Sequence, residues 1–152
     1  MVEAIWGEHK SSKQIVEILE ILQASGELAF VTRVEPEKAK EVKELFKKVE
    51  FHSHACCLTS GTTPDLNPSL GEVVVLSGGT SDLLVAAEAQ LALRLHGIKT
   101  ELLMDVGVSG LHRLLNHLDR LKKSKVLIAC AGMEGALPTV LAGLVPQPVI
   151  GV

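Results

Sequence analysis

Apolar and polar residues follow one another in a pattern that predicts strands and helices in alternation. The run from Val73 to Leu76 is wholly apolar and predicts a strand buried on both faces. After it the chain is rich in Ala and Leu from Asp82 to His96, and Gly97 is placed to stop the helix. The same reasoning predicts strands at 73–76, 99–104, 126–130 and 148–152, with helices at 82–96, 110–122 and 134–144. We therefore predict an α/β fold with a parallel, doubly wound (flavodoxin-like) sheet.

The N-terminal third predicts a smaller α/β lobe. Ser11 to Gln14 has the pattern of a capping box, and Pro36 opens a second helix, with strands expected at 4–6, 28–31 and 51–58. We place the lobe at residues 1–58, a turn-rich linker at 59–71 and the second domain at 72–152. The last strand pattern ends at Val152 without a polar tail or a covering helix. From this we expect a C-terminally truncated chain whose parent sequence continues.

Composition narrows the class of protein. Hydrophobic residues make up 47% of the chain, which indicates an ordered core. A net charge of −3 and few aromatic residues argue against a nucleic-acid surface. We find neither a run of membrane-span length nor a basic segment leading an apolar one, so we expect a cytoplasmic protein without membrane contact. The three cysteines fit a reducing compartment.

The turn after the first strand of the second domain predicts an anion site. Gly78 and Gly79 allow a tight turn and close approach of a ligand, and Thr80 or Ser81 is the expected N-cap of the following helix. Backbone N–H groups and the helix dipole there favour phosphate or carboxylate. Asp82 either complements the dipole or takes part in catalysis. The motif has neither the third glycine of a dinucleotide fingerprint nor the lysine of a P-loop.

A second loop, from Asp105 to Arg113, also follows a strand and opens a helix. His112 could exchange protons near neutral pH, and Arg113 could hold a phosphate through two hydrogen bonds. The alternative is a first-turn histidine beside a solvated arginine. Because the strands are expected to be parallel, this loop and the first should lie at the same edge of the sheet.

A third loop, residues 131–138, gathers small residues around one carboxylate. Gly132 and Gly135 would let the backbone approach a ligand, and Glu134 among apolar neighbours could transfer protons. The alternative is that Glu134 only complements a helix dipole. Elsewhere, His52, His54 and Cys56 would share one face of a strand, but without a second ligand cluster we expect no metal site.

Taken together, these three loops resemble the LarB family, whose second domain is related to PurE-type aminoimidazole ribonucleotide (AIR) carboxylases. The segments Glu3 to Glu8 and Val31 to Arg33 resemble the N-terminal part of LarB proteins. The second loop reads Val-Ser-Gly-Leu-His-Arg where purine enzymes have Ser-Ala-His-Arg, and the third contains a glutamate that they lack. These departures favour LarB over a purine enzyme.

The resemblance implies a pyridinium-3,5-biscarboxylic acid mononucleotide synthase of nickel-pincer cofactor biosynthesis. Such an enzyme carboxylates the pyridinium ring of nicotinic acid adenine dinucleotide with CO2 or bicarbonate, then hydrolyses the phosphoanhydride to release AMP. It implies homo-oligomers, no covalently bound cofactor, and compatibility with Mg²⁺. The implied catalytic residues are Asp82, Glu134 and His112, and the implied substrate-binding residues are Gly78, Gly79, Thr80, Ser81, Asp105, Ser109, Arg113, Gly132 and Gly135.

In the family a cysteine attacks the pyridinium ring, and its motif lies C-terminal to the position that Val152 occupies. None of Cys56, Cys57 or Cys130 occupies that motif, so we expect the chain to be inactive alone. Two alternatives stay open. One is a PurE-type AIR carboxylase or mutase of purine (IMP) biosynthesis, and the other is a non-catalytic nucleotide-binding module that forms oligomers.

Overall fold

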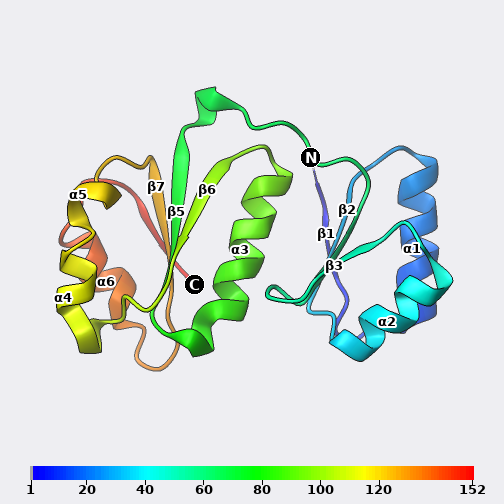
Figure 1. Ribbon diagram of the computed structural model, residues 1–152, viewed down its shortest axis with the longest axis horizontal. Coiled ribbons are helices and arrows are strands. Elements are labelled where there is room, and N and C mark those ends of the chain that lie inside the picture. The colour runs from blue at the N-terminus through cyan, green and yellow to red at the C-terminus, as the bar shows by residue number, and fades with distance from the viewer. Residues whose placement is uncertain (1) are drawn as a thin grey trace. The chain divides into compact units, whose positions relative to one another are not determined.

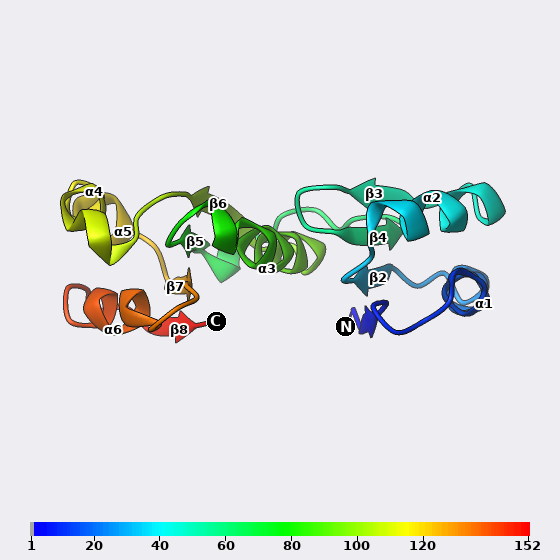
Figure 2. The same cartoon turned by 90° about the horizontal axis from the view of Figure 1, so that it is seen from below.

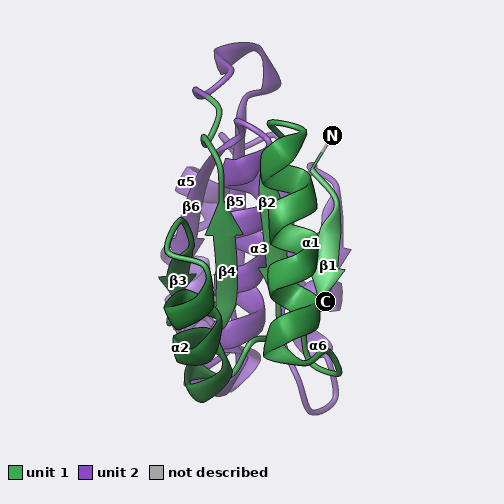
Figure 3. Cartoon of the chain, turned by 90° about the vertical axis from the view of Figure 1, so that its right-hand side faces the viewer, with its two compact units in different colours: residues 1–64 green, residues 65–152 purple. Residues whose placement is uncertain are grey.

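The computed structural model describes residues 2–152, and the chain divides into two compact units, residues 1–64 and 65–152 (Figure 1; Figure 3). No helix within residues 2–152 combines the length and the hydropathy needed to cross a lipid bilayer. The elements of unit 1 are β1 (Ala4–Trp6), α1 (Ser12–Ala24), β2 (Ala29–Thr32), α2 (Pro36–Leu45), β3 (Glu50–His52) and β4 (Cys57–Ser60). Those of unit 2 are β5 (Glu72–Ser77), α3 (Leu83–Leu95), β6 (Lys99–Leu103), α4 (Leu111–Leu115), α5 (Leu118–Leu121), β7 (Val126–Cys130), α6 (Ala136–Ala142) and β8 (Val149–Gly151), with 3-10 turns at Pro68–Leu70, Thr80–Asp82 and Val108–Gly110.

Unit 2 is the parallel α/β sheet that the sequence predicts. Its four strands run in the order β6-β5-β7-β8, and every neighbouring pair is parallel. Helix α3 lies on one side of the sheet, and α4, α5 and α6 lie on the other (Figure 1; Figure 2). The chain order reverses between β5 and β7. In doubly wound sheets a crevice opens at such a reversal, beyond the carboxyl ends of the strands.

Strand β5 is buried on both faces, as its apolar run predicts. Val74 and Leu76 belong to the core under α4, α5 and α6, whereas Val75 packs with Ala86 of α3 and with Cys130 on the other face. A side chain of this size stabilises the fold by roughly 1.5–3 kcal/mol when fully buried. The central strand therefore anchors both layers and holds the loop that follows it in place.

The prediction of a single helix at 110–122 is wrong. The structure has two short helices, α4 and α5, separated at Asn116 and His117. The carbonyl of His117 accepts hydrogen bonds from the N–H groups of Arg120 and Leu121, so a new helix starts there. The helix expected at 134–144 begins only at Ala136, because Gly135 adopts a left-handed backbone with φ of 61°.

Unit 1 contains a mixed sheet in the order β1-β2-β4-β3. Strands β1 and β2 are parallel, and β4 pairs antiparallel with both β2 and β3. Helices α1 and α2 share one core with the sheet, centred on Ile15, Leu19, Val31, Val42 and Leu58. The capping box at Ser11 and Gln14 is confirmed, and Gly26 has the left-handed φ of 69° at the end of α1.

The prediction of one strand at 51–58 is also wrong, because β3 and β4 form a hairpin there. Residues 53–56 turn between β3 and β4, and Cys56 takes a left-handed backbone with φ of 47°. His54 and Cys56 therefore lie in the turn and do not share a strand face with His52. Within residues 2–152 no group of three or more His, Cys, Asp or Glu side chains could hold a metal ion. Strand β4 runs through Ser60, so the first two residues of the expected linker, 59–71, belong to the sheet.

Candidate functional site at the carboxyl edge of the unit 2 sheet

Three loops meet at the carboxyl edge of the parallel strands of unit 2. The N–H of Gly78, after β5, donates to the carbonyl of Cys130 at the end of β7 at 2.9 Å. The N–H of Gly107, after β6, donates to the carbonyl of Gly78, also at 2.9 Å. The first loop is therefore hydrogen-bonded through its backbone to both of its neighbours. This confirms that the loops starting at residues 77, 105 and 131 lie at one edge.

Asp82 joins the first and third loops through its side chain. Its Oδ2 accepts the N–H of Gly79 at 2.9 Å, and its Oδ1 accepts the N–H of Gly132 at 2.8 Å. Because the first loop follows β5 and the third follows β7, this clamp bridges the strands between which the chain order reverses. Both carboxylate oxygens thus hold backbone groups. The structure gives Asp82 a positioning role that the sequence analysis did not foresee.

The prediction that Thr80 or Ser81 is the N-cap of the helix after β5 is also wrong. Neither Thr80 nor Ser81 caps α3, because Asp82 occupies the N-cap position of that helix. Gly79 is the N-cap of the preceding 3-10 turn, and the Asp82 side chain reaches back to its N–H. Thr80 and Ser81 instead form the first turn that leads into α3, and both residues are exposed. The first N–H groups of a helix lack partners within the helix. Amides and hydroxyls here can therefore face an anion in solvent.

Gly107 is a site residue that the sequence analysis did not single out. A Cβ on this residue would lie 2.6 Å from the carbonyl oxygen of Gly78, closer than real Cβ contacts allow. The two loops therefore touch backbone to backbone. Ser77 was also missed: it is buried at the end of β5, and its hydroxyl donates to the carbonyl of Gly79. A polar residue ending an apolar strand was the only signal in the sequence.

Arg113 is held by Asp105 across the second loop. Its Nε donates to the Asp105 carbonyl at 2.6 Å, and a terminal nitrogen lies 3.2 Å from the Asp105 carboxylate. Asp105 adopts a left-handed backbone with φ of 59°, and it uses both its main chain and its side chain to hold the guanidinium. Gly110 packs against the same group, since a Cβ there would lie 2.4 Å from an Arg113 nitrogen. Arg113 is thus fixed before any anion arrives.

The remaining candidates lie in solvent at the same edge. Ser109 is exposed in the turn before α4, and His112 is exposed in its first turn. Glu134 is exposed in the third loop, so the apolar surroundings expected for it are absent from this structure. Gly135 has its N–H bonded to the carbonyl of Gly132 at 3.0 Å. No hydrogen bond or ion pair within residues 2–152 connects the side chains of His112 and Glu134 with Asp82.

Cys130 lies directly beneath the clamp. It is fully buried at the end of β7, and burial, reinforced by the negative charge of Asp82, raises the pKa of its thiol to about 11. A thiol must lose its proton to act as a nucleophile. Cys130 is therefore neutral and unreactive near neutral pH, which agrees with its expected role as a small core residue.

Comparison with known families accounts for both units. Residues 72–152 match the AIR carboxylase family, and residues 1–62 match the LarB/PurE-like N-terminal domain. The chain belongs to the LarB/PurE-related AIR carboxylase family. The three loops of unit 2 thus lie within the AIR carboxylase domain, and unit 1 contains the LarB-type N-terminal domain.

Two relatives come from the archaeon Methanocaldococcus jannaschii. One is an uncharacterized protein, 35% identical over 158 aligned residues that cover 99% of this chain and 61% of the relative. The other is an N5-carboxyaminoimidazole ribonucleotide mutase, 35% identical over 83 residues that cover 53% of this chain and 50% of the mutase. The chain therefore spans about three fifths of one relative and half of the other.

Proposed function

We propose that this chain is part of a LarB-type carboxylase and hydrolase that acts on nicotinic acid adenine dinucleotide. In this reaction a pyridinium C–H bond is replaced by a C–C bond to CO2, and the ring proton is lost. Water then adds across the phosphoanhydride and AMP leaves. The observation that carries the proposal is the pairing of a LarB/PurE-like N-terminal domain with an AIR carboxylase domain in one chain.

The edge of unit 2 offers groups suited to the anionic parts of this substrate. Thr80 and Ser81 present hydroxyls and first-turn amides to solvent, where a phosphate or carboxylate is favoured by the helix dipole. Arg113 adds a positive charge whose orientation is set by Asp105. A guanidinium held in advance loses less conformational entropy when it binds an anion.

The groups proposed to transfer protons are exposed at the carboxyl edge of the unit 2 sheet. His112 and Glu134 are both open to solvent and stand in the loops after β6 and β7. Asp82 uses both oxygens to hold Gly79 and Gly132, so in this arrangement it positions the loops and does not exchange protons. The proposal therefore assigns proton transfer to His112 and Glu134, and the positioning of the first and third loops to Asp82.

No thiol nucleophile is assigned to unit 2. Cys130 is its only cysteine, and its neutral thiol is buried beneath the loops. The sulfur step of LarB-type chemistry therefore requires a thiol from outside residues 72–152.

The test is to incubate the protein, as its gene encodes it, with nicotinic acid adenine dinucleotide and isotope-labelled bicarbonate. The proposal expects label in the pyridinium product together with release of AMP. If the dinucleotide binds but neither labelled product nor AMP appears, the proposal is refuted. Calorimetry with the 152-residue chain separately measures binding of the dinucleotide, of AMP and of aminoimidazole ribonucleotide.

A mutase or carboxylase acting on aminoimidazole ribonucleotide is the second candidate, favoured by the likeness of 83 residues to a mutase of that class. It predicts conversion of the carboxylated ribonucleotide without any AMP release. Activity on this substrate alone would replace the first proposal by the second. If none of the three ligands binds, both enzyme proposals fail for this chain.

A further inference from the structure

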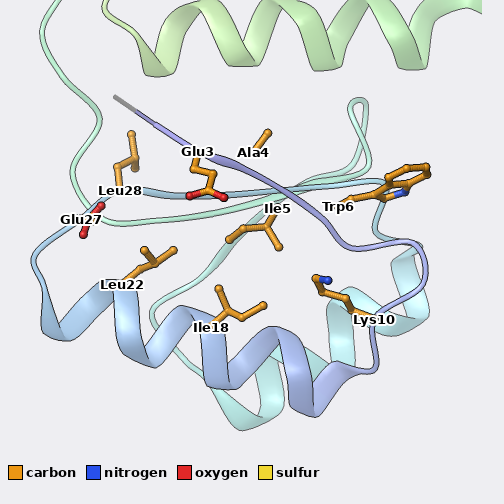
Figure 4. Close-up of a pocket in the computed structure, with 9 residues that line it drawn as sticks. All are labelled: Glu3, Ala4, Ile5, Trp6, Lys10, Ile18, Leu22, Glu27 and Leu28. Carbon is orange, nitrogen blue, oxygen red and sulfur yellow. The ribbon is translucent and has the colours of Figure 1, made fainter.

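Unit 1 contains a hollow of its own, between β1 and α1 (Figure 4). Its volume is about 290 Å³, close to the lower end, roughly 300 Å³, of ordinary small-ligand sites. The apolar wall is formed by Ile5 from β1 and by Ile18 and Leu22 from α1. We call this the β1–α1 hollow. It lies within the N-terminal unit and shares no residue with the loops of unit 2.

Charges of opposite sign line this hollow without pairing. Lys10 projects its ammonium group into one end, below Trp6, and Glu3 and Glu27 lie toward the other end (Figure 4). Within residues 2–152 none of these three side chains has a hydrogen bond or an ion pair. Lys10 is half-buried, whereas Glu3 and Glu27 are exposed to solvent. The hollow is thus cationic at one end, apolar along its middle and acidic at the other end.

The cationic end is rigid. The indole Nε1–H of Trp6 donates to Glu8 at 2.9 Å, and the guanidinium of Arg33 lies 5.9 Å from the centre of the indole ring. Lys38 donates to the carbonyls of Gly7 and Glu8 at 3.0 and 2.7 Å. These bonds fix the loop that carries Lys10. Such preorganisation reduces the entropy that a ligand must overcome when it binds.

Only the cationic end of the hollow, at Trp6 and Lys10, lies at the carboxyl edge of a parallel strand pair, whereas Glu3, Glu27 and Leu28 lie at the amino edge. Strands β1 and β2 are parallel and are joined through α1, so the loops after Trp6 and after Thr32 lie at the same carboxyl edge. Arg33 in the second of these loops has a left-handed backbone with φ of 54°. This conformation is uncommon in a non-glycine residue, but Arg33 does not line the hollow and reaches it only through the ring of Trp6.

We propose that the β1–α1 hollow binds a nucleoside monophosphate whose base carries an amino group. The phosphate meets Lys10 at the cationic end, the flat base and the ribose cover Ile5, Ile18 and Leu22, and the amino group donates to Glu3 or Glu27. One ligand thereby pairs charges that the protein leaves unpaired. The inference does not rest on the function proposed for unit 2.

The chain provides its own reporter, because Trp6 is its only tryptophan and it contains no tyrosine. The experiment titrates the 152-residue protein with AMP and follows Trp6 emission. Adenosine lacks the phosphate, and inosine monophosphate has an oxygen in place of the amino group. We expect saturable binding of AMP and an affinity at least about tenfold lower for each of the other two, the loss expected for one charge-assisted hydrogen bond.

Substitutions at each end of the hollow test which part of the ligand that end binds. Lys10→Gln should weaken AMP binding about tenfold, whereas Lys13→Gln, on the exposed side of α1, should leave it unchanged. Glu27→Gln, tested together with Glu3→Gln, should remove the preference for AMP over inosine monophosphate, because an amide can donate as well as accept. Lys10 is half-buried and the other substituted residues are exposed, and circular dichroism checks that each variant is folded.

The proposal is overturned if AMP leaves Trp6 emission unchanged, or if adenosine and inosine monophosphate bind as tightly as AMP. Full binding by Lys10→Gln also overturns it. The outcome is separable from that of the unit 2 reaction. Disrupting the clamp with Asp82→Asn should change binding there without altering the Trp6 titration.

Discussion

The carboxylate of Asp82 accepts the N–H of Gly132 at 2.8 Å, across fifty residues of chain. Its second oxygen holds Gly79, so one side chain sets the spacing of two loops. The pair is a long-range contact between a helix-entry residue and a loop glycine. It fixes the first loop against the third, while Thr80 and Ser81 remain exposed to solvent.

Asp82→Asn should loosen the contact between the first and third loops. An asparagine offers only one acceptor oxygen and turns an NH2 group toward a backbone N–H, so one of the two bonds is lost. We expect unit 2 to lose about 1–3 kcal/mol of stability, measured by urea unfolding. Amide exchange should accelerate most at Gly79 and Gly132. Asp119→Asn, an exposed residue in α5, is the control, and an equal effect there would contradict the clamp.

Gly107→Ala should separate the first and second loops. The φ of Gly107 is −62°, which alanine adopts readily, so the effect is steric alone. Its Cβ would lie 2.6 Å from the Gly78 oxygen, and relief requires a backbone shift. We expect a loss of about 1–3 kcal/mol in the free energy of unfolding. Gly143→Ala, whose Cβ would stand 3.5 Å from its nearest neighbour, should cost little.

Cys130 should make unit 2 sensitive to alkali. Its thiol has a folded-state pKa of about 11, above the ordinary value of 9.0, because it is buried and lies near the charge of Asp82. Between pH 9.0 and 11 the thiol loses its proton in the unfolded chain but keeps it in the folded one. The contribution of Cys130 to the free energy of unfolding is therefore fully present below pH 9.0 and is lost as the pH rises toward 11. The free energy of unfolding lost across this pH range is about 3 kcal/mol.

The measurement compares unfolding free energies of the native protein and Cys130→Ala across that pH range. The variant should be less stable near neutral pH, because it leaves a small void, but its stability should decline less steeply with pH. Parallel curves for the two proteins would contradict the pKa argument. In the native protein, maleimide should not label Cys130 near neutral pH.

Arg120 stabilises the opposite edge of the same sheet. It donates to Glu72 at 2.9 Å and also to Glu101, and Lys99 lies 3.6 Å from Glu72. Arg120→Met should leave the partly buried Glu72 with only the weak partner Lys99. We expect a loss of about 1 kcal/mol, reduced from buried-pair values because the group is partly exposed, and smaller in high salt. Arg94→Met, on exposed helix surface, is the matched control, and ligand binding should be unchanged in both.

The sequence predicted the sheet of unit 2 well because its signals are local. The unbroken apolar run from Val73 to Leu76 favours a strand buried on both faces, and Gly97 marks the end of α3 through its positive φ of 71°. The strand at 126–130 is found with the predicted bounds. These features depend on neighbours in the chain, which a pattern of residues records directly.

The errors have physical causes that the pattern does not record. The turn between β3 and β4 contains neither glycine nor proline, because Cys56 itself takes the left-handed conformation. The break between α4 and α5 occurs at Asn116 and His117, which are poor but tolerated helix residues. The role of Asp82 depends on Gly132, which lies far away in the sequence. Local propensity cannot reveal a partner of this kind.

The strand order of unit 2 also has a consequence for synthesis on the ribosome. Residues 72–103 can form β5, α3 and β6 as soon as they emerge, but the other edge of β5 has no partner until residues 126–130 are made. During that interval an apolar strand edge is open to pairing with another nascent chain. We expect this intermediate to be the step at which chaperones protect the protein, and the point at which slow translation would most favour aggregation.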